Sequence, residues 1–78
     1  MATVTVLFFA ALREARGVDE QVVEIAAGTT CEELYTRLFP GRLSGLPVGF
    51  ARNQAHTAGT TPLEDGDEVA FLPPLGGG

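Results

Sequence analysis

The end of the sequence constrains the fold more than any other segment, because an apolar run leads directly into two consecutive prolines. Residues 69–72 combine β-branched, aromatic and aliphatic side chains, which is typical of a buried β-strand. Pro73 and Pro74 have no backbone N–H to donate to a neighbouring strand, so strand pairing has to end just before them. We therefore predict a folded domain over 1–72 and a flexible tail over 73–78.

The predicted tail has few side chains and ends in three glycines. Its six residues could span about 20 Å at ~3.3 Å per residue. Glycine adopts backbone conformations that are closed to other residues, so such a tail can pass through a narrow channel. These features predict that the carboxylate of Gly78 is delivered into a site on another protein. The residues expected to lie in the channel are Pro73, Pro74, Leu75, Gly76 and Gly77. A disordered terminus, a linker or a cloning remnant is the alternative interpretation.

Length and composition exclude several classes of function. A chain of 78 residues is long enough for one domain with a single small core. One cysteine, Cys31, excludes an internal disulfide and a multi-cysteine site, and we expect no bound metal. The formal net charge of −5 and the absence of lysine argue against a nucleic-acid partner. No stretch reaches the ~20 apolar residues of a membrane span and no targeting segment is evident, so we expect a cytoplasmic protein without a membrane partner.

Local signals predict five strands and two helices. Thr30 is a favourable N-cap for the main helix, and Glu33 three residues later completes a capping box. Cys31, Leu34, Tyr35 and Leu38 form its apolar stripe. The predicted strands are 3–9, 21–26, 48–52, 54–57 and 69–72, and the predicted helices are 10–16, which stops at Gly17, and the segment from Thr30 to Pro40. This order indicates a small α+β domain.

Alternation along the first and last strands predicts an exposed apolar patch. If Val4, Val6 and Phe8 point towards the main helix, Leu7 and Phe9 point away from it. Leu72 should also lie on the outward face, and small domains rarely leave such a patch bare without a partner. The expected partner-binding residues are Leu7, Phe9, Phe50 and Leu72.

Three other features are interpreted as structural. Cys31 lies on the apolar stripe of the main helix, so it should be a core residue and not a nucleophile. His56 has no carboxylate or second histidine nearby in the sequence, which favours an ordinary surface position. The acidic segment 64–67 lacks the spacing of an EF-hand, so we expect a solvated turn there.

The chain resembles the small subunit of molybdopterin synthase, the MoaD type within the MoaD/ThiS sulfur carriers. Its ending, Asp-Gly-Asp-Glu-Val-Ala-Phe-Leu-Pro-Pro at 65–74 followed by Gly77 and Gly78, looks like the end of that family. Val-Leu-Phe-Phe-Ala at 6–10 resembles its start, and Asn53 follows the third strand as in the family. The resemblance implies a ubiquitin-like β-grasp, with a mixed sheet of four to five strands and one main helix on one face.

The same resemblance implies a route for sulfur through Gly78. A separate activating enzyme of the MoeB type would use ATP to adenylate the carboxylate, and sulfur transfer would leave a thiocarboxylate. The tail would then dock in a larger, MoaE-type subunit, where the sulfur is given to a pterin precursor for the dithiolene of molybdopterin. This chain has no glycine-rich loop between a strand and a helix to hold phosphates, so we expect it to bind no cofactor itself. It would contribute the sulfur and no catalytic side chain.

Three other functions remain open at this point. The sulfur carrier of thiamine biosynthesis has the same fold and a Gly-Gly end, although Pro73-Pro74 and Arg13-Glu14 look less like it. A ubiquitin-like modifier would use Gly78 to form an amide with a lysine of another protein. A passive β-grasp interaction module would carry the tail without using it.

Overall fold

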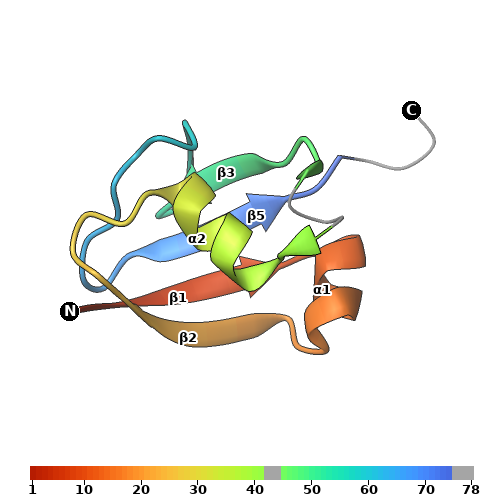
Figure 1. Ribbon diagram of the computed structural model, residues 1–78, viewed down its shortest axis with the longest axis horizontal. Coiled ribbons are helices and arrows are strands. Elements are labelled where there is room, and N and C mark those ends of the chain that lie inside the picture. The colour runs from red at the N-terminus through yellow and green to blue at the C-terminus, as the bar shows by residue number, and fades with distance from the viewer. Residues whose placement is uncertain (42–44, 75–78) are drawn as a thin grey trace.

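The computed structural model describes residues 1–41 and 45–74, which contain one mixed sheet and two helices (Figure 1). The strands lie in the order β2-β1-β5-β3-β4. Only the central pair, β1 and β5, is parallel, and the other neighbours are antiparallel. The elements are β1 Ala2–Phe8, α1 Ala10–Arg16, β2 Glu20–Ile25, α2 Cys31–Leu38, β3 Gly49–Arg52, β4 Ala55–Thr57 and β5 Glu68–Leu72.

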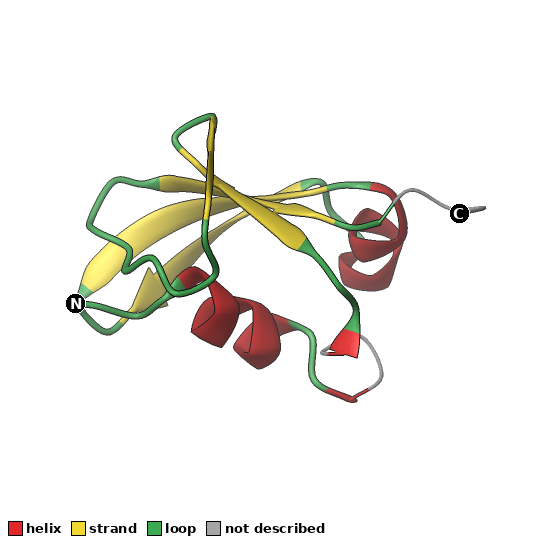
Figure 2. Ribbon diagram, turned by 90° about the horizontal axis from the view of Figure 1, so that it is seen from above, coloured by secondary structure: helices red, strands yellow, loops and turns green. Residues whose placement is uncertain are grey.

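This arrangement confirms the predicted β-grasp. The last strand returns to lie beside the first, and α2 covers one face of the sheet (Figure 2). β1 ends one residue earlier than predicted. Phe9 instead precedes α1 as its cap residue, and Ala10, the first residue of the helix, has a φ of 50° that turns the chain out of the sheet. None of the helices described for 1–41 and 45–74 is long and apolar enough to cross a bilayer.

The start of α2 has the predicted capping box. The backbone N–H of Glu33 donates to Thr30 Oγ1 over 3.2 Å, and the backbone N–H of Thr30 donates to Glu33 Oε1 over 2.9 Å. These bonds satisfy two groups that the first helical turn leaves without partners. The stripe expected to face the sheet is buried as a whole, and its members are Cys31, Leu34, Tyr35 and Leu38.

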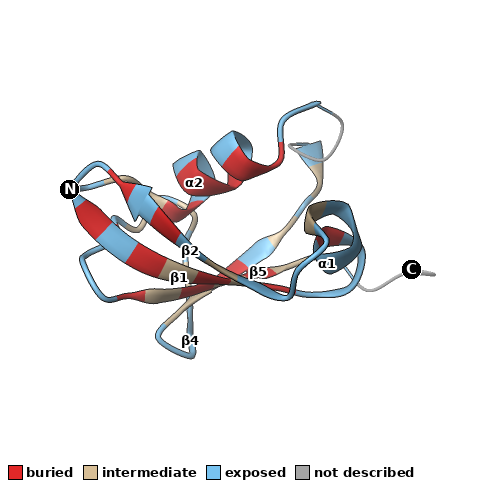
Figure 3. Cartoon of the chain, turned by 90° about the horizontal axis from the view of Figure 1, so that it is seen from below, coloured by how far each residue is buried: buried red, intermediate tan, exposed pale blue. Residues whose placement is uncertain are grey.

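The core lies between α2 and the inward face of the sheet. Along β1, buried residues alternate with more exposed ones, as Figure 3 shows. Phe71 of β5 is at the centre of an aromatic cluster and is fully buried. Its ring centroid lies 5.1 Å from Tyr35, 5.8 Å from Phe50, 6.1 Å from Phe39 and 6.2 Å from Phe8. The last strand is therefore held from the inside by one large side chain just before the tail begins.

Helix α1 is joined to the rest of the fold by Arg16. The guanidinium Nη2 donates to Gln21 Oε1 over 2.6 Å, and Nη1 donates to the carbonyl of Leu38 over 3.2 Å. The same group lies 5.8 Å from the ring centre of Phe8, within reach of a cation–π interaction. Gly17 then ends the helix with a φ of 78°, as the sequence predicted.

Candidate functional site at the root of the tail

The tail leaves the sheet from the end of a central strand. β5 lies between β1 and β3, and its last residue, Leu72, is opposite Gly49. Pro73 is half-buried and Pro74 is exposed. Because β5 runs in the same direction as β1, the root of the tail is at the end of the sheet away from the N-terminus (Figure 1). The predicted channel residues Leu75, Gly76 and Gly77, together with Gly78, lie outside the described residues.

An apolar patch adjoins this root on the outward face of the sheet. Leu7 is opposite Ala70, and both belong to the face that does not meet α2. Leu7 and Leu72 are half-buried, and Phe9 is 44% exposed although it is a large apolar residue. Ala51 and Gly49 of β3 continue this face with little or no side chain. We call Leu7, Phe9, Ala70 and Leu72 the sheet patch.

The placement of Phe50 corrects the sequence prediction. Phe50 does not join the sheet patch, because it is only 9% exposed and belongs to the core. The antiparallel register of β3 and β5 places it opposite Phe71, whose side chain points inwards. Its ring also meets Tyr35, with centroids 6.2 Å apart. A strand as short as 49–52 offers too few positions for an alternating pattern to show which face is buried.

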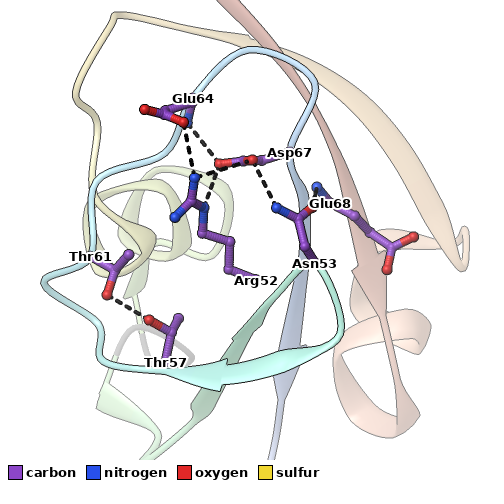
Figure 4. Close-up of polar contacts among 7 residues, drawn as sticks. All are labelled: Arg52, Asn53, Thr57, Thr61, Glu64, Asp67 and Glu68. Atoms are coloured by element: carbon purple, nitrogen blue, oxygen red, sulfur yellow. Dashed lines mark hydrogen bonds and ion pairs between the residues drawn. The ribbon is translucent and has the colours of Figure 1, made fainter.

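A polar cluster anchors the opposite end of β5 (Figure 4). Arg52 Nε donates to Asp67 Oδ2 over 2.7 Å, and Asn53 Nδ2 donates to Asp67 Oδ1 over 3.0 Å. The backbone N–H of Glu64 adds a third bond to Asp67 Oδ2 over 2.8 Å. Asp67 is only 6% exposed, so the prediction of a solvated turn is wrong at this position. The last strand is thus held at its start by this cluster and near its end by Phe71.

Asn53 also fixes the hairpin between β3 and β4. It has a positive φ of 52°, and Gln54 follows with a φ of 71°. Asn53 Oδ1 accepts a hydrogen bond from the backbone N–H of Glu68 over 2.9 Å. Sequence reasoning treated the segment after β3 and the acidic turn separately. The signal that linked them was the family resemblance, because Asn53 and residues 65–74 are both among the residues that carry it.

Asp67 has a lowered pKa that makes the fold sensitive to acid. Burial by itself raises this pKa, but the hydrogen bonds from Arg52, from the Glu64 backbone and from Asn53 outweigh it. A carboxyl group whose pKa is lower in the folded state stabilises the fold above its unfolded pKa of about 3.9. That contribution disappears as the pH falls from this value through the pKa of the folded state.

We expect Asp67→Asn to lower the free energy of unfolding by about 1–3 kcal/mol at pH 7, because Arg52 would lose the buried one of its two charged partners and keep only the exposed Glu64. The difference from the unchanged chain should shrink as the pH falls through the window just described. Urea unfolding between pH 7 and about pH 3 measures this. Asp19→Asn is the control, since Asp19 is an exposed aspartate outside the cluster. Equal effects of the two substitutions at pH 7 would contradict the role given to Asp67.

The side chains of Cys31 and His56 lie in the structural positions that the sequence predicts. Cys31 is fully buried, as predicted, and burial raises the pKa of its thiol. His56 is exposed on β4, also as predicted. Within 1–41 and 45–74, no three His, Cys, Asp or Glu side chains gather closely enough to hold a metal ion.

Solved structures support the assignment of the fold. The small archaeal modifier protein 1 of Methanosarcina acetivorans superposes with a TM-score of 0.71 at 28% identity, covering 100% of this chain and 98% of that one. In a complex of subunits 1 and 2 of the molybdopterin-converting factor from Helicobacter pylori, a matching chain has a TM-score of 0.62 and 27% identity. The match covers 97% of this chain and 99% of the other.

Sequence comparison identifies the family. A molybdopterin synthase sulfur carrier subunit from Chlamydomonas reinhardtii is 40% identical over 81 residues, which cover 96% of this chain and 98% of that protein. The model of the ThiS family matches residues 6–78, a span that takes in the sheet patch, the polar cluster and the tail. A family match over nearly the whole chain, on a β-grasp whose last strand leads into a Gly-Gly end, means that this protein belongs to the ThiS family.

Proposed function

We propose that this chain is the sulfur carrier subunit of a molybdopterin synthase and that Gly78 carries the sulfur. The observation that supports this most strongly is the likeness over almost the full length to a protein of that name. The fold is suited to this function, because Asp67 anchors the start of β5 and Phe71 anchors its end. The last residue of β5 lies beside the partly exposed sheet patch.

The chemistry requires activation of the terminal carboxylate. A carboxylate is a poor acyl donor, because its leaving group would be oxide. Attack of the Gly78 carboxylate on the α-phosphate of ATP forms an acyl-adenylate and releases pyrophosphate. A sulfur nucleophile then attacks the carbonyl carbon, AMP leaves, and a thiocarboxylate remains. ATP would be bound by a separate activating enzyme, of the MoeB type, and this chain would bind no cofactor.

The larger, MoaE-type synthase subunit is the partner that we propose for the sheet patch. The Helicobacter structure is, by its title, a complex of two molybdopterin-converting factor subunits, and the chain that matches belongs to that complex. Leu7, Phe9 and Leu72 offer apolar area that the isolated domain leaves partly in water. Catalytic side chains for the pterin would come from the larger subunit. We expect the two to meet in the cytoplasm.

Intact-mass measurement tests the proposal. After incubation with the activating enzyme, ATP and a sulfur donor, the chain should gain the mass difference between one sulfur and one oxygen atom. Cys31→Ala is the matched control for sulfur held elsewhere as a persulfide, and it should load equally because the thiol is buried. Loss of the mass gain in Cys31→Ala, or no gain in the unchanged chain, would contradict the proposal. Delivery to a thiazole precursor instead of a pterin would assign the chain to thiamine synthesis.

A further inference from the structure

Helix α1 is attached to the rest of the domain by two side chains that lie one turn apart. Leu12 is fully buried in the core, and Arg16, four positions later on the same side of the helix, is half-buried. The other residues of α1 are exposed. The position of α1 on the domain therefore depends on one apolar contact and on one guanidinium group.

The guanidinium of Arg16 lies where two helices end. Arg16 is the last residue of α1, and its Nη1 donates to the carbonyl of Leu38, the last residue of α2, over 3.2 Å. Carbonyl groups in the last turn of a helix carry partial negative charge, so they stabilise a cation there. Nη2 donates to Gln21 Oε1 of β2 over 2.6 Å. Arg16 thus joins α1 to both α2 and β2 without an ion pair among the residues that the structure describes.

The side chain of Arg16 is not the one that stability alone would favour at this position. Its Nε is buried and has no hydrogen-bond partner within 1–41 and 45–74. A buried N–H group without a partner lowers stability, and an apolar side chain of similar length would avoid this loss. The guanidinium instead fixes direction, because it is held by two hydrogen bonds and lies 5.8 Å from the ring centre of Phe8 and 6.0 Å from that of Phe39.

The placement of Phe9 depends on α1. Phe9 follows the last residue of β1 that pairs with β5, and it is the cap residue of the helix. Its carbonyl accepts hydrogen bonds from the backbone N–H of Leu12 over 3.0 Å and from that of Arg13 over 3.3 Å. Ala10 comes next with a φ of 50°, a conformation that alanine keeps only where the surrounding structure holds it. A shift of α1 would therefore displace an aromatic side chain that belongs to the sheet patch.

We propose that Arg16 is a positioning residue for docking, which holds α1 against α2 and β2 and thereby fixes Phe9 in the sheet patch. This inference rests on the docking of the larger subunit that is proposed above. Phe8 points to the inward face of the sheet, so the guanidinium beside its ring lies on the side away from the patch. The effect of Arg16 on docking therefore passes through α1 and Phe9.

Arg16→Met tests the inference, because methionine keeps a long apolar side chain but cannot donate the two hydrogen bonds. The fraction of molecules with α1 in place should fall, and the apparent affinity for the larger subunit should fall by the same factor, about tenfold. Arg37→Met is the matched control. Arg37 Nη1 also donates to a backbone carbonyl, that of Glu24, but this residue is opposite Thr3, away from the tail root. The control should leave docking unchanged.

A double-mutant cycle shows whether Arg16 acts through Phe9. In a chain that carries Phe9→Ala, Arg16→Met should weaken docking by less than about twofold further, because the side chain that it positions is already gone. Equal losses of affinity in the two backgrounds would overturn the inference, and so would unchanged docking of Arg16→Met. If Phe9→Ala alone leaves docking unchanged, the sheet patch and this inference are both wrong, whereas sulfur loading of Gly78 would still support the carrier function.

Amide hydrogen exchange gives a readout that needs no partner. The amides of Leu12 and Arg13 should exchange at least about tenfold faster in Arg16→Met than in the unchanged chain, because α1 opens locally. The amides of the central strand β1 should keep their rates. If Arg16→Met does not fold, Arg16→Lys keeps the positive charge at the two helix ends and should show a smaller change in the same amides. Equal acceleration of α1 and β1 amides in the variant that folds would show a general loss of stability and overturn the positioning role.

Discussion

Removal of Gly77 and Gly78 should abolish sulfur transfer and leave the folded domain unchanged. Glycine has no side chain to contribute to a core, and the described core ends with Phe71, so we expect the deletion to leave the fold intact. The loss should be complete, because the sulfur is proposed to sit on the carboxyl group that the deletion removes. Intact mass reports sulfur loading, and urea unfolding reports the free energy of the fold. Full sulfur transfer by the truncated chain would contradict the assignment of Gly78.

Docking to the larger subunit should depend on different residues. Ordering a glycine-rich tail costs about 1–2 kcal/mol per residue, and its few side chains offset little of this loss. Most of the affinity should therefore come from the sheet patch. We expect Phe9→Ala or Leu72→Ala to weaken docking more than deletion of Gly78 does. Prolines at the start of the tail reduce the cost, because they limit the conformations of the free tail.

A binding titration with the larger subunit measures this division of roles. Val22→Ala is the matched control, because Val22 is 64% exposed on the edge strand β2 and lies away from the tail root. It should leave docking unchanged. A much larger loss of affinity on deletion of Gly78 than on either patch substitution would show that the tail, and not the patch, holds the complex together.

Phe71→Ala should destabilise the domain by about 3–5 kcal/mol, the usual cost of deleting a fully buried phenylalanine side chain. Phe71 contacts four other aromatic rings, so the cavity would open at the centre of the core. A domain of this size has a total stability of roughly 5–15 kcal/mol, so much of it would be lost. Equilibrium unfolding in urea measures the change.

Phe9→Ala is the control for this experiment, because it removes the same atoms from a side chain that is 44% exposed. Its cost should stay below about 1 kcal/mol. If Phe71→Ala does not fold, Phe71→Leu can be measured instead, because leucine keeps most of the buried volume. Apart from the loss of the ring contacts, this substitution should lower the free energy of unfolding by less than about 1.5 kcal/mol. Similar costs at positions 9 and 71 would contradict the view that Phe71 anchors the tail root.

The sequence by itself determined the features that depend on neighbouring residues. Thr30 and Glu33 lie three positions apart, so the start of α2 could be predicted from the spacing of a capping box. Gly17 ended α1 because glycine accepts a positive φ at little cost. Pro73 and Pro74 marked the end of the last strand, since neither can donate to a sheet. Each of these effects acts within one turn or one strand.

The tertiary structure decided the features that depend on pairing between distant strands. Arg52 and Asp67 are 15 positions apart, and only the antiparallel register of β3 and β5 brings them within 2.7 Å. The same register places Phe50 in the core, whereas the sequence had predicted it on the partner-binding surface. A one-residue shift in register moves every side chain of a strand to the other face, and short strands contain too little alternation to exclude such a shift. Hence the end of the last strand could be predicted from the sequence, whereas the composition of the patch beside it required the sheet.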